Sequence, residues 1–157
     1  MTKTVLELPD PLATEEFGRK LAKLFSPGDT VFLEGELGAG KTTLVRSILR
    51  GMGWAGAVRS PSYALIHSYP DLAPPVHHLD LYRLGSAEEA MGLDLDQYAN
   101  RGAILLVEWA DRLEGSMIPR YTVRLEITGP ESRKAEIDPS IDAYIDTRNI
   151  AQGAAKQ

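Results

Sequence analysis

The stretch from Gly35 to Thr42, Gly-Glu-Leu-Gly-Ala-Gly-Lys-Thr, has the residue types and spacing of a loop that binds phosphate groups. It fits the pattern G-x-x-x-x-G-K-[ST], in which glycines let the backbone curl until consecutive N–H groups point at phosphate oxygens. In that pattern the lysine contacts the β- and γ-phosphates of a nucleoside triphosphate, and the hydroxyl that follows it ligates Mg²⁺. The sequence therefore predicts that Lys41 contacts phosphate and that Thr42 binds the metal ion.

The segments on either side of this loop are those that a phosphate-binding loop requires. Residues Thr30 to Leu33 are mostly apolar and partly β-branched, which indicates a buried strand. From Thr43 to Arg50, leucine, valine and isoleucine recur at helical spacing. The positive end of this helix dipole lies where phosphates bind in such loops. An ordinary glycine-rich turn with a chance lysine is therefore the weaker interpretation.

Two acidic residues are placed to complete a nucleotide site. Mg²⁺ requires oxygen ligands, and an attacking water requires a base or an orienting group. Glu108 follows the continuous apolar run Ile104-Leu105-Leu106-Val107, which is typical of a central buried strand. Asp80 is the second candidate, because it ends the shorter strand-like segment that begins at Val76. A solvated strand-end carboxylate is the alternative for each, and for Asp80 the spacing alone does not decide between the two.

Turn residues and hydrophobic patterning predict the elements that position these side chains. Thr14 is expected to cap a helix whose first turn carries Glu15 and Glu16, and the start of this helix is expected near the base of a bound nucleotide. Ser86 and Glu89 have the spacing of a capping box that opens a short helix. Further strands are expected at residues 4–8, 62–69, 76–81, 121–128 and 133–137, with hairpins between the second and third and between the last two.

Composition limits the class of protein. The chain has 157 residues, which fits one domain with a sizeable core, and it contains no cysteine for a disulfide or thiolate site. Its net charge of −5 argues against a broad nucleic-acid surface, and no apolar stretch has the length of a signal peptide or membrane span. The cytoplasm is the expected location. We expect a P-loop ATPase domain over residues 1–139 and a weakly ordered tail over residues 140–157.

Several other side chains allow two interpretations. The segment from Ser60 to Tyr63 has the position of a loop that senses the γ-phosphate, although a plain strand entry explains it equally well. His77 and His78 lie on opposite faces of a strand, so one is expected to be buried and the other exposed. Trp109 either stacks on a ring or packs in the core. Three arginines have a position from which they could reach a phosphate, but an exposed or paired side chain is the commoner outcome: Arg59, Arg83 and Arg112.

The order of these motifs resembles the bacterial TsaE (YjeE) family of ATPases in tRNA threonylcarbamoyladenosine biosynthesis. The resemblance rests on the loop from Gly35 to Thr43, then Ser60-Pro61-Ser62-Tyr63, then His78-Leu79-Asp80-Leu81-Tyr82-Arg83-Leu84, then Leu106-Val107-Glu108-Trp109. It covers about Leu8 to Ile137. The phosphate loop alone is common to many proteins, whereas the D-L-Y-R-L and V-E-W segments in this order are more specific.

The resemblance implies an α/β fold of the P-loop NTPase type, with three layers and a mixed sheet that contains antiparallel strands. It implies ATP and Mg²⁺ as cofactors, with Lys41, Glu108 and Asp80 as catalytic residues and with Thr42 and Glu108 at the metal. It further implies that Ser62 belongs to the switch-like loop and that Trp109 lies close to the site. The implied nucleotide-binding residues are Thr14, Glu36, Leu37, Gly38, Ala39, Gly40, Lys41, Thr42, Thr43, Ser62, Trp109 and Arg133.

The resemblance also implies partners. The family's ATPase docks on a pair of proteins, TsaB and TsaD, and its hydrolysis resets that complex while TsaD modifies the adenosine beside the anticodon. The chain would then contact tRNA only indirectly and would not bind a membrane. Two alternatives remain open from the residues: a small-molecule P-loop kinase, and a non-catalytic module that uses nucleotide as a conformational switch.

Overall fold

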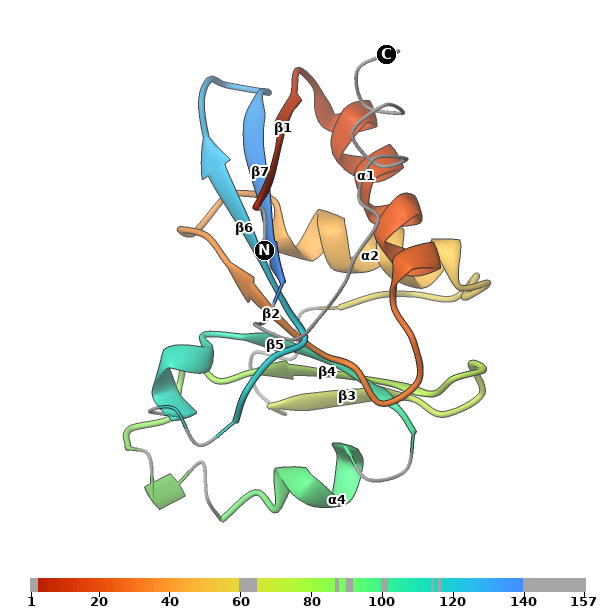
Figure 1. Cartoon of the computed structure of the whole chain (residues 1–157), viewed down its shortest axis with the longest axis vertical. Helices are drawn as coiled ribbons and strands as arrows, with labels where there is room; N and C mark the ends of the chain where they lie inside the picture. The colour runs from red at the N-terminus through yellow and green to blue at the C-terminus, as the bar shows by residue number, and fades with distance from the viewer. Residues whose placement is uncertain are drawn as a thin grey trace.

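The computed structural model of the chain describes residues 3–59, 65–86, 88–89, 92–99, 102–113, 115 and 117–139. These residues form one seven-stranded sheet in the order β1-β7-β6-β2-β5-β4-β3, with helices on its faces (Figure 1). The elements in chain order are β1 (Thr4–Leu8), α1 (Pro11–Leu24), β2 (Thr30–Glu34), α2 (Lys41–Gly51), β3 (Ile66–Tyr69), β4 (Val76–Asp80), α4 (Leu95–Ala99), β5 (Ile104–Glu108), the 3-10 helix η1 (Ala110–Leu113), β6 (Tyr121–Ile127) and β7 (Arg133–Pro139).

The sheet combines a parallel centre with antiparallel margins. Strands β6, β2, β5 and β4 pair in parallel with one another in that order, whereas β3 pairs with β4, and β7 with both β6 and β1, in antiparallel fashion. Every residue of β5 is buried, as expected for a central strand covered on both faces. The predicted mixed sheet, with its two hairpins, is confirmed.

Helices cover both faces of the sheet, so the molecule has three layers. On one face, α1 and α2 pack against each other and against β-strand side chains that include Val31, Ile104 and Leu106. On the other face, α4 and η1 pack over alternate residues of the same strands, including Leu79, Leu105 and Val107. Figure 1 shows α1 and α2 side by side and α4 beside the β3–β4 hairpin. The expected three-layer α/β fold of the P-loop NTPase type is confirmed.

The predicted N-terminus of the first helix is wrong by one turn. α1 begins at Pro11, and the Asp10 side chain caps it by accepting a hydrogen bond from the Ala13 N–H at 2.8 Å. Thr14 therefore lies inside the helix, where it is buried, and does not cap it. Aspartate and threonine are both good caps, but Pro11 has no N–H and a backbone angle suited to the first helical position, which favours Asp10.

The other predicted elements agree with the structure to within a few residues. One half of the predicted Ser86–Glu89 capping box is present, because the Glu89 N–H donates to Ser86 Oγ at 3.2 Å, whereas the Glu89 carboxylate accepts from the Gly85 N–H at 3.0 Å. Part of the short helix that it was expected to open lies outside the described residues. The first part of the predicted strand at residues 62–69, including Ser62, and the predicted tail at residues 140–157 lie outside the described residues. Among the described residues, the structure contains no helix with the length and apolar character that crossing a membrane requires.

Candidate functional site

The Gly35–Thr42 loop connects β2 to α2 at the carboxyl edge of the parallel strands. Gly38 and Gly40 have φ of 84° and 103°, and Gly40 is the N-cap of α2 in the left-handed conformation. A side chain is strained in that region, which explains the glycines at these turns. The resulting curl leaves the first N–H groups of an eleven-residue helix at the loop, where they can donate to an anion.

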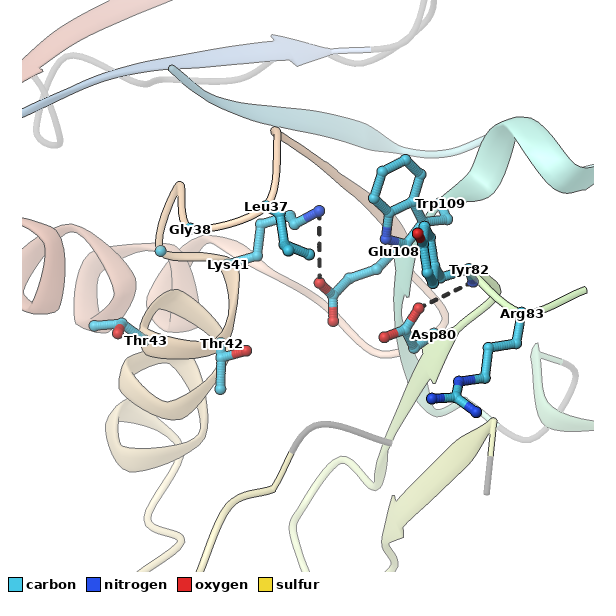
Figure 2. Close-up of a pocket in the computed structure, with 11 residues that line it drawn as sticks. Leu37, Gly38, Lys41, Thr42, Thr43, Asp80, Tyr82, Arg83, Glu108 and Trp109 are labelled. Carbon is cyan, nitrogen blue, oxygen red and sulfur yellow. Dashed lines mark hydrogen bonds and ion pairs between the residues drawn. The ribbon is translucent and has the colours of Figure 1, made fainter. Parts of the chain in front are cut away.

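A cleft of about 460 Å³ opens in front of this loop. Its lining comes from three places in the chain: the loop with the start of α2, the segment after β4, and the end of β5 (Figure 2). We refer to it as the P-loop cleft, and the residues that line it are Leu37, Gly38, Gly40, Lys41, Thr42, Thr43, Asp80, Tyr82, Arg83, Glu108 and Trp109.

The two predicted carboxylates meet at the floor of the P-loop cleft. Asp80 ends β4, Glu108 ends β5, and the two are register partners in the parallel pairing of these strands. Both are largely buried, with 9% and 4% exposure. Oδ1 of Asp80 also accepts a hydrogen bond from the Tyr82 N–H at 3.0 Å, which fixes the turn that follows β4. The spacing of Asp80 from Val76 left its role open, and the register now places it in the cleft.

The Glu108 carboxylate lies between two basic side chains. Its Oε1 is 4.0 Å from Lys41 Nζ, and its Oε2 is 2.6 Å from His78 Nε2. Lys41 is itself 92% buried and donates from Nζ to the Gly35 carbonyl at 2.6 Å. The ammonium group is therefore folded back on its own loop, beside the carboxylate (Figure 2).

Trp109 forms one wall of the P-loop cleft. Its backbone has φ of 59°, a left-handed conformation that is unusual for a bulky residue. Lys41 Nζ lies 4.4 Å from the centre of this ring, within cation–π range, and the Tyr82 ring packs against it at 4.9 Å between centroids. The lysine is thus held by a carbonyl, a carboxylate and an aromatic face.

The structure brings most of the predicted site residues together and places the others elsewhere. Glu36 lines a neighbouring cavity of about 570 Å³ that shares Lys41 and Trp109 with the P-loop cleft. Ala39 is buried, as is Thr14 on α1, and neither lines the P-loop cleft. Ser62 lies outside the described residues. The predicted residues that do line the cleft are Leu37, Gly38, Gly40, Lys41, Thr42, Thr43, Asp80, Glu108 and Trp109.

Arg133, at the start of β7, contacts the loop from outside the P-loop cleft. Its Nε donates to the Ala39 carbonyl at 2.9 Å and one terminal nitrogen donates to the Gly38 carbonyl at 3.1 Å. The other terminal nitrogen donates to the carbonyls of Gly129 and Ser132 in the β6–β7 turn. The Arg133 guanidinium thus holds two consecutive carbonyls of the loop and supports its curl.

Sequence reasoning missed one lining residue and one buried partner, and it left Arg83 open. Tyr82 and Arg83 line the P-loop cleft, and their position directly after Asp80 was the available signal. Of the other two arginines considered, Arg59 lines a separate cavity beside β3, and Arg112 lines none of the cavities described above. His78 is 1% exposed and contacts Glu108, whereas His77 is partly exposed and pairs with Ser68 on the other face.

The donor set of the P-loop cleft suits Mg²⁺. The Thr42 hydroxyl and the carboxylates of Asp80 and Glu108 are hard oxygen donors, and Mg²⁺ is usually held by one or two carboxylates together with substrate phosphates and water. No group of three or more histidine, cysteine, aspartate or glutamate side chains with metal-binding geometry occurs among the described residues. The site therefore fits an ion that arrives with phosphate and does not form a complete cage of protein ligands.

The sheet order, the glycine loop before α2 and the strand-end carboxylates define a nucleotide-binding protein of the P-loop NTPase class. The family model "Threonylcarbamoyl adenosine biosynthesis protein TsaE" matches residues 8–137, and the chain belongs to the TsaE family.

Individual relatives agree with this assignment. The chain is 37% identical to the tRNA threonylcarbamoyladenosine biosynthesis protein TsaE of Haemophilus influenzae, over 91% of this chain and 84% of that protein. It is 48% identical to the protein of the same name from Streptomyces coelicolor, over 71% of this chain and 77% of that protein. Among solved structures, YdiB of Bacillus subtilis superposes with a TM-score of 0.76 and 26% identity, covering 99% of this chain and 95% of that one.

Proposed function

We propose that this chain binds ATP with Mg²⁺ in the P-loop cleft, hydrolyses it, and acts in tRNA threonylcarbamoyladenosine biosynthesis. The observation that carries the proposal is the meeting of Lys41 and Glu108 at the floor of a glycine-loop cleft, with Asp80 beside them. The names of the family and of its relatives supply the process.

The residues of the chain have distinct tasks in this proposal. The backbone N–H groups of the loop bind the phosphates, and Lys41 Nζ exchanges its contact with the Gly35 carbonyl for phosphate oxygens. Thr42 Oγ1 and Glu108 would hold Mg²⁺, which when bound neutralises charge on the β- and γ-phosphates. Glu108 orients the attacking water and takes up its proton at a carboxylate oxygen, and the products are ADP and inorganic phosphate. Asp80 supplies the second negative charge at this end of the site.

The partners follow from the family. We propose that a TsaB–TsaD-like pair docks on this chain, that tRNA is contacted only through that complex, and that the process takes place in the cytoplasm. The net charge of −5 is consistent with docking on proteins and with the absence of a broad tRNA surface.

The test is ATP turnover by the purified chain, measured alone and with the partner pair. We expect slow hydrolysis alone and a clearly faster rate with the pair, because Arg83, the one described arginine that lines the P-loop cleft, is exposed. Equal rates with and without the pair would contradict the coupling. ATP consumption that requires an added nucleoside or other acceptor would indicate a kinase instead. Full biological function of Glu108→Ala would indicate a non-catalytic switch.

We also propose that residues 1–139 form the complete ATPase domain. β7 ends at Pro139 and pairs with both β1 and β6, so a chain that ends there keeps all seven strands. A chain truncated after Pro139 should bind ATP with unchanged affinity, and loss of folding or binding on truncation would overturn this boundary.

A further inference from the structure

His78 is buried directly behind the Glu108 carboxylate. It lies on β4 two residues before Asp80, is 1% exposed, and is absent from the lining of the P-loop cleft. Its Nε2 is 2.6 Å from Glu108 Oε2, a short contact between two buried side chains on neighbouring strands. An ionised carboxylate can only accept a hydrogen bond, so Nε2 carries the hydrogen and donates it.

The contact with Glu108 is the polar contact that explains a histidine at this position. Nδ1 of His78 is buried and has no hydrogen-bond partner among the described residues. Val76, which shares the face of β4 with His78, is buried and apolar. A hydrocarbon side chain would fill this space without leaving a ring nitrogen unpaired, and burying an unpaired polar atom costs free energy. Packing alone therefore does not account for His78.

We propose that His78 is a positioning residue that holds the Glu108 carboxylate in its working orientation. The hydrogen bond ties Oε2 to the interior, so Oε1 is the oxygen that faces Lys41 at 4.0 Å and the cleft. Without this bond, Lys41 would be the one partner left to the Glu108 side chain among the described residues, and their attraction would draw the carboxylate to the ammonium group. Lys41 and Glu108 would then be paired with each other, and neither would be available to the phosphates or to Mg²⁺. This inference rests on the proposed role of Glu108.

Three variants of the full chain test the proposal. His78→Leu removes the donor, whereas His78→Gln keeps an amide N–H at the reach of Nε2. His77→Leu is the matched control, because His77 is the adjacent residue, points to the other face of the sheet and pairs with Ser68 Oγ at 2.7 Å. For each variant we would measure the thermal midpoint, ATP turnover, and the Mg²⁺ concentration that half-saturates nucleotide binding.

We expect His78→Leu to lower kcat and to raise the half-saturating Mg²⁺ concentration by about 10- to 100-fold, the usual effect of losing a hydrogen bond to a metal ligand. ATP affinity without Mg²⁺ should stay near that of the wild type, because the loop and Lys41 are unchanged. His78→Gln should recover most of both effects, and His77→Leu should behave as the wild type. Equal losses in His78→Leu and His78→Gln would show that the ring is needed only for packing. Wild-type behaviour of His78→Leu would also overturn the proposal.

A measurement on the ligand-free protein covers the case in which His78→Leu does not fold. The chain has three histidines, so ¹⁵N-histidine spectra resolve each ring. We expect the His78 ring to carry its hydrogen on Nε2 in an exchange-protected bond that Glu108→Ala abolishes, while the other two rings are unaffected. A His78 ring that is indifferent to Glu108→Ala would overturn the proposal. If the wild type binds Mg²⁺ and ATP but shows no turnover, the proposed hydrolysis is wrong. The Mg²⁺ concentration that half-saturates nucleotide binding and the histidine spectra would still decide the role of His78.

Discussion

Lys41 Nζ lies 4.0 Å from Glu108 Oε1 and at the same time donates to the Gly35 carbonyl at 2.6 Å. The lysine that is expected to contact phosphate is therefore drawn toward the floor of the P-loop cleft by a carboxylate and a carbonyl. A triphosphate has to compete with both groups for this ammonium, so nucleotide affinity and the charge on Glu108 are linked.

Neutralising Glu108 should separate binding from hydrolysis. In the absence of Mg²⁺, we expect Glu108→Gln to bind ATP at least as tightly as the wild type, because Lys41 loses an anionic competitor and the phosphates lose a nearby negative charge. Hydrolysis should fall by about 10²- to 10⁴-fold, the usual contribution of a positioned acid or base. Calorimetric titration and phosphate release measure the two quantities. Glu126→Gln, an exposed carboxylate on β6, is the control, and weaker ATP binding by Glu108→Gln would contradict the linkage.

The contacts of Arg133 predict an effect on both stability and nucleotide affinity. Arg133→Ala removes the donors to the Gly38 and Ala39 carbonyls and should destabilise the protein by about 2 kcal/mol, since hydrogen bonds from charged groups contribute about 1.5–3 kcal/mol. ATP affinity should also fall, because the loop loses its outer support. Denaturant unfolding and nucleotide titration check these expectations.

Lys134 provides a matched control for that experiment. It is the next residue on β7 and makes ion pairs at 3.8 Å with Glu126 and Glu136. Lys134→Ala should change the free energy of unfolding by about 0.5 kcal/mol or less, as is usual for partly exposed ion pairs. If Arg133→Ala and Lys134→Ala have the same effect on ATP affinity, support of the loop by Arg133 is refuted.

The parts of the site that the sequence predicts are those set by local pattern. The glycine loop, the buried strand before it and the apolar run of β5 can be predicted from consecutive residues, and parallel pairing then brings Asp80 and Glu108 to one edge.

Other features depend on contacts that a local pattern does not contain. The predicted start of α1 is wrong because Asp10 and Thr14 are both acceptable caps and a neighbouring proline decides between them. Period-two alternation puts His77 and His78 on opposite faces, but which of them faces α2 depends on strand register. The contacts of Arg133 with Gly38 and Ala39 join segments that are 95 and 94 residues apart, so no local pattern reports them.

Two buried tyrosines predict a loss of stability at alkaline pH. Burial raises the pKa of Tyr121 above its usual value of 10.0, with Asp29 adding to the shift and Arg120 opposing it, and burial also raises the pKa of Tyr69. A raised pKa in the folded state means that the stabilisation is complete below pH 10 and is lost as the pH rises through the folded pKa. We expect the free energy of unfolding of the wild type to fall more steeply above pH 10 than that of Tyr121→Phe. Parallel curves for the two proteins would contradict this assignment.

Trp109 should report nucleotide binding by its fluorescence. The chain has two tryptophans, and Trp54 is engaged away from the P-loop cleft, with its Nε1 donating to the Ala57 carbonyl at 3.1 Å and its ring packed edge-on to Tyr69. Trp54→Phe leaves Trp109 as the only tryptophan, whose emission can be excited selectively. Movement of Lys41 from this ring to phosphate changes its electrostatic environment, so ATP should shift its emission. Trp109→Phe, which keeps Trp54, should show no change, and a response from Trp54 alone would place the ligand elsewhere.

Arg83 provides the last prediction, which concerns stimulation by the partner pair. It lines the P-loop cleft on the same side as Asp80, and its side chain is exposed (Figure 2). An arginine that contacts the transferred phosphoryl group contributes about 10³-fold or more to the rate. We expect Arg83 to make this contact when the partner pair is docked, so it should contribute little to the slow basal rate and much more to the stimulated rate. Arg83→Ala should lower the stimulated kcat by about 10³-fold while the basal rate changes little. Arg83→Lys should recover little of this loss, because an ammonium group lacks the planar fork of a guanidinium.

Arg59→Ala is the control, because it removes the same charge beside a separate cavity, and it should leave both rates unchanged. Equal losses in the basal and stimulated rates would show that Arg83 acts independently of the partner pair, and equal effects of Arg83→Ala and Arg59→Ala would reduce its role to general charge.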